Sequence, residues 1–95
     1  MKNSYKITVT DNNEPGRKLE FDYPVHDEML GLIELTRDRL GFSEEKHNAF
    51  MLGLKLLGEV IIEERKSDLF KEFSPHFKDF MQRIKKQCKD PKDVK

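Results

Sequence analysis

The sequence predicts a single α+β domain, in which an N-terminal antiparallel β-hairpin is followed by three α-helices (ββααα). Three observations predict this class: two short alternating runs near the N-terminus, a long apolar run in the middle, and an amphipathic run towards the C-terminus. The 95 residues suffice for one domain, and with 36% hydrophobic residues its core must be concentrated in a few elements. We expect the domain to span residues 1–88 and residues 89–95 to form a polar, frayed C-terminal tail.

The hairpin is predicted from two runs, residues 5–10 and 19–23, that alternate large apolar with polar side chains. The residues between the runs are rich in turn formers. If Val9 pairs with Leu19, all six large side chains lie on one face, as a half-buried antiparallel pair requires. These six are Tyr5, Ile7, Val9, Leu19, Phe21 and Tyr23. We expect Pro24 to end the second strand.

The first helix is predicted over about 28–40. Asp27 is a good N-cap for it, and Gly41 follows the last periodic residue, where a left-handed C-cap usually lies. The helix that follows, about 44–65, is the central element of the prediction. Between its residues 49 and 62 the polar side chains are those of Lys55 and Glu59, so the helix is apolar over most of its circumference. Such a helix must be covered on several sides.

The last helix is predicted at about 75–88, with Ser74 as its N-cap. Its large apolar residues recur at i, i+3, i+4 and i+7, which is typical of an amphipathic helix. They are Phe77, Phe80, Met81 and Ile84. The connection over residues 66–73 is too apolar for a free linker, so we expect its large side chains to pack against the core as a short turn. They are Leu69, Phe70 and Phe73.

The charges of the chain balance, with 18 basic and 18 acidic side chains, so no net charge attracts a polyanion or an acidic membrane. They are unevenly placed, since residues 1–77 carry 11 basic and 15 acidic side chains and residues 78–95 carry 7 and 3. We interpret the basic end as a lysine-rich helix terminus. The alternative is a nucleic-acid-binding arm, which we do not favour because acidic residues interrupt the run. They are Asp79, Asp90 and Asp93.

Features of a membrane or secreted protein are missing from the sequence. No apolar run approaches the ~18 residues that a spanning helix needs, and no apolar signal-peptide region precedes the first strand. Cys88 is the single cysteine, so no intrachain disulfide can form, and a lone thiol suits a reducing compartment. We therefore expect a cytoplasmic protein that does not bind membranes.

A search for catalytic motifs finds no glycine-rich phosphate loop, no HExxH and no paired CxxC. The three histidines are His26, His47 and His76, each near a predicted helix start. A metal site needs three or four ligands in a fixed geometry, which their spacing does not supply. We therefore assign no catalytic residue, cofactor or metal, and we lean towards a protein that is not an enzyme.

The candidate polar stripe consists of Lys55, Glu59 and Glu63, which recur every four residues along one side of the central helix. One interpretation is a solvated stripe on a mostly buried helix. The other is that these charges are partly buried and line a pocket, where their pKa values would be perturbed.

Gly53 and Gly58 are the candidate helix-contact glycines, because each costs about 0.8–1 kcal/mol relative to alanine inside a helix. Such a cost is usually tolerated where another backbone approaches closely. That neighbour is either an element of the same chain or the same helix of a second copy across a two-fold axis. A homodimer could instead join two hairpins at their free edges. The alternative to both is a monomer, in which the hairpin covers the remaining arc of the central helix.

The strand over residues 5–10 and the helix segment over residues 52–60 resemble a family of small uncharacterised bacterial proteins, domain-of-unknown-function family 3861. The similarity spans most of the chain, from Tyr5 to about Ile84. Its most specific part matches at Gly53, Lys55, Gly58 and Glu59. The resemblance implies a bacterial source and a compact α+β domain, and it implies no activity because none is assigned to the family.

Three functional hypotheses follow. The preferred one is a small non-enzymatic interaction or regulatory module that associates with itself or with another protein. The second is a small-molecule-binding protein or enzyme that uses the polar stripe, which a concave pocket at the stripe would favour. The third, which we do not favour, is nucleic-acid binding through the basic C-terminal segment.

Overall fold

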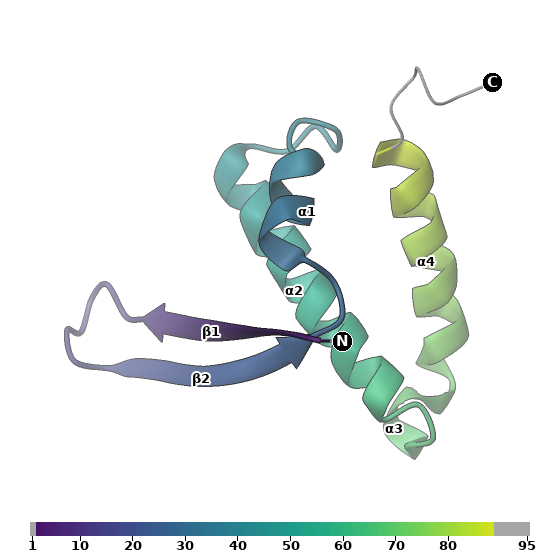
Figure 1. Ribbon diagram of the computed structural model, residues 1–95, viewed down its shortest axis with the longest axis horizontal. Helices are drawn as coiled ribbons and strands as arrows, with labels where there is room; N and C mark the ends of the chain where they lie inside the picture. Colours follow the sequence, from purple (N-terminus) through teal and green to yellow (C-terminus); the bar gives the residue numbers. More distant parts are fainter. Residues whose placement is uncertain (1, 89–95) are drawn as a thin grey trace.

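The computed structural model describes residues 2–88, so the expected tail at 89–95 lies outside the described residues. The chain forms an N-terminal hairpin and then helices, which confirms the α+β class (Figure 1). The elements are β1 (Asn3–Thr10), β2 (Lys18–Val25), α1 (Met29–Leu35), α2 (Glu44–Glu63), α3 (Asp68–Lys71) and α4 (Phe73–Cys88). Among the helices of this described part, none is long and apolar enough to cross a membrane.

The hairpin has the predicted register. β1 and β2 are antiparallel, and Val9 lies opposite Leu19. The prediction that Pro24 ends the second strand is wrong, because β2 continues to Val25 with Pro24 opposite Ser4. A strand with one hydrogen-bonded neighbour tolerates proline, since alternate N–H groups point away from that neighbour.

The apolar face of the hairpin is covered at its base and exposed towards its tip. Ile7 is 8% exposed, whereas Val9 and Leu19 are 58% and 59% exposed and Phe21 is 38% exposed. Figure 1 shows the reason: only the base of the hairpin lies against the helices, and its loop end projects away from them. The expectation of six half-buried side chains is therefore wrong for the distal half.

α1 is shorter than predicted, since it ends at Leu35 and is followed by turns up to Gly41. Its N-cap is Glu28 rather than Asp27, because the Glu28 carboxylate accepts the Gly31 N–H at 2.6 Å. Gly41 does have a left-handed backbone, with φ of 78°, but it lies in the loop before α2 rather than at the end of α1. A side-chain hydrogen bond thus places the start of this helix one residue later than the N-cap preference of Asp27 indicates.

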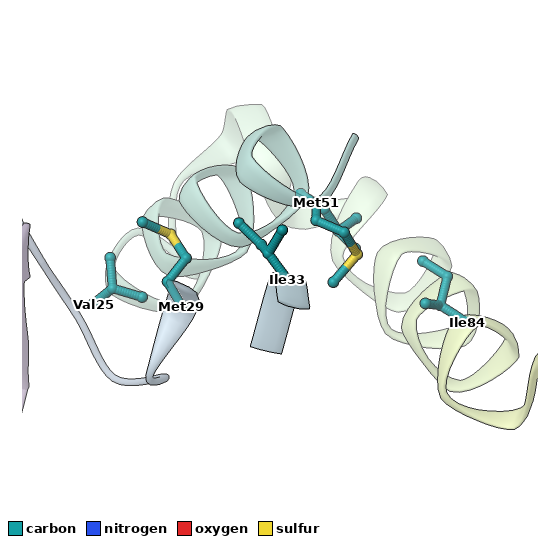
Figure 2. Packing of buried hydrophobic residues seen from close by; sticks show 6 residues of the cluster. Val25, Met29, Ile33, Met51 and Ile84 are labelled. Carbon is teal, nitrogen blue, oxygen red and sulfur yellow. The ribbon is translucent and has the colours of Figure 1, made fainter. Parts of the chain in front are cut away.

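α2 is the central helix, as predicted, although it ends at Glu63 rather than at residue 65. A row of buried side chains passes beside it, from the end of β2 past α1 to α4 (Figure 2). The row consists of Val25, Met29, Ile33, Met51, Leu54 and Ile84. His47, which is 1% exposed, joins α2 to α1 because its Nε2 lies 3.0 Å from the Ile33 carbonyl oxygen and 3.1 Å from Thr36 Oγ1.

The cover of α2 is incomplete within one chain. Leu57 and Ile62 are 40% and 57% exposed, so the expected burial on several sides holds for only part of the helix. α4 packs against it partly through aromatic rings, with Phe50 and Phe80 edge to face at 6.2 Å. The Arg39 guanidinium also donates to the Cys88 carbonyl at 2.7 Å, which holds the end of α4 to the loop after α1.

The connection between α2 and α4 departs from the prediction. Leu69 and Phe73 are 78% and 45% exposed, so only Phe70 of the three expected side chains is even partly buried. Ser74 is not an N-cap, because it lies inside α4. The backbone of Glu72, between α3 and α4, is already helical, so the chain passes from one helix into the next without a cap.

Candidate functional site

The candidate polar stripe of α2 faces the segment that joins the hairpin to α1, together with the N-terminus. Lys55 pairs with Asp27 at 3.0 Å, and Glu59 contacts His26 at 2.8 Å. Glu63 pairs with Lys2 at 2.9 Å. Each of the three residues is therefore held by a contact with a distant part of the chain. The interpretation of a freely solvated stripe does not describe Lys55 or Glu59.

The residues around Glu59 form a polar cluster that consists of Lys2, Tyr23, His26, Glu59 and Glu63. Glu59 lies at its centre and is 4% exposed. The His26 backbone N–H donates to Oε1 at 3.0 Å, while His26 Nδ1 and Lys2 Nζ lie 2.8 Å and 3.0 Å from Oε2. A buried carboxylate is tolerated when it is paired and hydrogen-bonded in this way. The contacts fix the turn after β2 and the N-terminal strand to the same turn of α2.

The protonation of the cluster follows from these contacts. Burial by itself raises the pKa of Glu59, but the hydrogen bonds from the His26 amide, Lys2 and the His26 ring outweigh it, so the pKa is lowered. The hydrogen bonds of Glu63 with Tyr23 and Lys2 lower the pKa of Glu63 and raise those of Tyr23 and Lys2. Both carboxylates are therefore ionised at neutral pH and occupied as acceptors. Such a cluster fastens the hairpin to α2. A general base that accepts protons near pH 7 would need a raised carboxyl pKa, whereas the pKa values of Glu59 and Glu63 are lowered.

Lys55 and Glu59 also line a groove of about 590 Å³ between α2 and α4. A smaller hollow of about 210 Å³ continues it towards the end of α4. The two hollows share Asp27, Leu54, Lys55, Met81 and Lys85. Glu63 does not line this groove, so the pocket interpretation applies to two of the three predicted residues.

The two candidate glycines differ. A Cβ atom at Gly58 would lie 3.3 Å from the ring of Phe77, so this glycine allows α4 to approach α2. A Cβ atom at Gly53 would meet nothing within 4 Å. Within the chain, Gly58 therefore meets a side chain of α4 rather than another backbone, and Gly53 faces solvent. The assignment of the two glycines as helix contacts stays a prediction.

Cys88 and the histidines lack the features of a reactive thiol and of a metal site. Burial raises the pKa of the Cys88 thiol, although Arg39 opposes the shift, so the thiolate is disfavoured. Over residues 2–88, no group of three or more His, Cys, Asp and Glu side chains is placed to hold a metal ion. The His26 ring contacts the Glu59 carboxylate.

Sequence reasoning missed Lys2, Tyr23 and His26 as partners of the stripe. For Tyr23 a signal existed, since the predicted register places it at the base of the hairpin, where α2 could be reached. For Lys2 no local signal existed, because its contact with Glu63 joins residues that are 61 positions apart.

Fold and site together define a small α+β protein in which a two-stranded hairpin is fastened to a central helix through the buried carboxylate of Glu59, beside an apolar groove. A family model described as a domain of unknown function with solved structure, DUF3861, matches residues 3–86, and the chain belongs to this family. A crystal structure of a protein of unknown function from Pectobacterium atrosepticum is similar to the chain, with 44% identity and a TM-score of 0.86. The similarity covers 90% of this chain and 99% of that one. Among curated proteins, none matches the chain.

The family confirms the resemblance that the strand and central helix indicate, and the similar structure comes from a bacterium. Neither comparison indicates a specific function. The function must therefore be argued from the geometry of this chain.

Proposed function

We propose that this protein is a small non-enzymatic interaction module that associates with a second copy of itself through the distal apolar face of its hairpin. The observation that supports this proposal is the exposure of Val9, Leu19 and Phe21, all on one side of strands that have no other strand neighbour among residues 2–88. A hairpin alone is marginally stable in water, and its free edges favour pairing with another chain.

The shape of the molecule supports the same proposal. Its radius of gyration is 15.3 Å, compared with about 12 Å for a compact domain of this length. One copy of the chain is therefore more extended than the compact domain that the resemblance implies. The hairpin accounts for much of the extension, as Figure 1 shows. An exposed apolar face on a projecting hairpin is typical of a surface that packs against another molecule.

The opposite face of the hairpin is suited to water. Lys6 and Lys18 lie 3.4 Å and 3.5 Å from the carboxylate oxygens of Glu20. Exposed ion pairs of this kind add little stability, but they keep that face solvated. The apolar face is therefore the one that would meet the second copy. Helix pairing at Gly58 receives no support, because the Phe77 ring occupies the space beside it.

The proposal includes a non-enzymatic role and a cytoplasmic location. The non-enzymatic role is supported by the lowered pKa values of Glu59 and Glu63, which leave neither carboxylate poised for proton transfer at neutral pH. The cytoplasmic location is supported by the half-buried free thiol of Cys88, which a reducing compartment preserves.

Light scattering over a range of micromolar concentrations tests self-association. We expect the wild-type mass to approach twice 11.3 kDa. Val9→Asp should shift the protein to monomer because it places a charge in the apolar contact. Thr8→Asp, on the opposite face of the same strand, should leave the mass unchanged. A wild-type mass of 11.3 kDa at every concentration would refute the proposal.

A further inference from the structure

The groove between α2 and α4 carries a second inference, which does not depend on self-association. We propose that it is a binding site for an amphipathic anion, a fatty acid with an unbranched chain of medium length. Its main hollow of about 590 Å³ is within the range of roughly 300–1,000 Å³ that small-molecule sites occupy. Its continuation by a second hollow makes the site elongated, as an alkyl chain requires.

The floor of the groove is apolar. Leu54 from α2 and Met81 from α4 line both hollows, so they mark the line along which a hydrocarbon chain would lie. Ile62 lines the main hollow and is 57% exposed, although it belongs to the central helix. Ile84 and Met51 line the far hollow. A hydrocarbon chain on this floor would remove apolar surface from water mainly at Ile62 and Met81, because Leu54, Ile84 and Met51 are already buried.

The charges of the groove select an anionic head group. Lys55 pairs with Asp27, and Glu59 and Glu63 share the ammonium group of Lys2. Lys78 and Lys85 line the groove from α4 and have no acidic partner among residues 2–88. They are seven residues apart, which places them on one face of α4 about 10 Å apart along its axis.

Two unpaired ammonium groups above an apolar floor are complementary to a ligand with one negative end and an apolar body. A neutral hydrocarbon would leave both lysines unused, and a cationic amphiphile would be repelled by them. A carboxylate at either lysine can still reach water, because both lysines are exposed. This arrangement suits a head group that is never fully desolvated.

Decanoate, below its micelle concentration, is the probe for this site, and the full chain with ¹³C-methyl methionine is the protein. Met81 lines both hollows and Met51 lines the smaller one, whereas Met29 lines neither. Met51 and Met29 are both 2% exposed, so their position relative to the groove is what distinguishes them. We expect saturable shifts of the Met81 and Met51 methyl signals, with the Met29 signal unchanged. Absence of a saturable Met81 shift would overturn the proposal.

The charge requirement is tested with neighbouring lysines on the same helix. Lys85→Ala should weaken decanoate binding roughly two- to fivefold, and adding Lys78→Ala should weaken it by a similar factor again. Lys86→Ala is the matched control, because Lys86 is exposed and does not line the groove, and it should bind as wild type. Circular dichroism confirms that each variant is folded. Equal affinities of the Lys85→Ala and Lys86→Ala proteins would overturn the anionic part of the proposal, as would equal binding of decanol.

The same titration in the Val9→Asp variant separates this inference from self-association. Val9 lies on the distal hairpin and does not line the groove, so the monomeric variant should keep its affinity for decanoate. Loss of binding in that variant would show that the groove site needs the second copy, contrary to the inference.

Discussion

Replacing Glu59 by glutamine tests whether the polar cluster around this buried carboxylate fastens the hairpin to the central helix. The substitution keeps the size of the side chain but removes its charge, so Lys2 and His26 each lose an ionised acceptor. Hydrogen bonds to charged groups contribute about 1.5–3 kcal/mol each when buried, and exposed pairs contribute much less. Because Lys2 and the His26 ring are 30% and 56% exposed, we expect a total loss of about 2 kcal/mol at pH 7. For a domain of this size that corresponds to a fall in Tm of roughly 8–16 °C.

The pH dependence of this loss identifies its origin. The pKa of Glu59 is lowered in the folded protein, so its stabilising contribution is present above the unfolded pKa of about 4.3 and disappears as the pH falls through the folded value. The difference between wild type and Glu59→Gln should therefore shrink as the pH falls below about 4. Thermal unfolding followed by circular dichroism between pH 7 and pH 3 measures it.

Glu64→Gln is the matched control for that experiment. Glu64 directly follows α2 as its C-cap, is exposed, and has no side-chain hydrogen bond or ion pair within residues 2–88, so its replacement should change stability by less than about 0.5 kcal/mol. The reasoning is refuted if Glu59→Gln melts like wild type at pH 7. It is also refuted if the difference between them does not change with pH, because the cost would then come from packing rather than from charge.

Two further predictions concern α2. Gly53→Ala should stabilise the protein by about 0.5–1 kcal/mol in urea unfolding, since the new Cβ meets nothing within 4 Å. Gly58→Ala should stabilise it clearly less, because the Phe77 ring lies 3.3 Å from the new atom. Equal gains in stability would contradict the contact at Gly58. Ile61→Asp should cost several kcal/mol and unfold the domain, because Ile61 is 5% exposed, while Ile62→Asp at a 57% exposed position should remain folded. A cooperative thermal transition in Ile61→Asp would show that α2 is not central.

The predicted elements that proved accurate depend on regular patterns. The period of two in the strands led to the correct register, because one slipped residue would move every large side chain to the other face. The nearly continuous apolar run identified α2 as the helix around which the others pack. The predictions that failed, at Pro24, Asp27 and Ser74, assumed that a residue with a strong local preference ends or begins an element where it stands.

The candidate site was predicted in part. The spacing of Lys55, Glu59 and Glu63 placed them on one side of the helix, but it could not tell a solvated stripe from a paired cluster. That distinction depends on where the turn after β2 and the N-terminus lie. Gly53 and Gly58 were likewise equivalent in sequence, and only the position of the Phe77 ring separates them.

By itself, then, the sequence determined the α+β class, the hairpin register and the identity of the central helix, because these follow from periodic burial within a continuous segment. The tertiary structure alone decided that Glu59 is buried among donors from His26 and Lys2, and that Lys78 and Lys85 stand over an apolar groove. It also decided that the distal hairpin stays exposed. The physical reason is that burial, pairing and concavity are properties of several segments together, and their contacts join residues that are tens of positions apart.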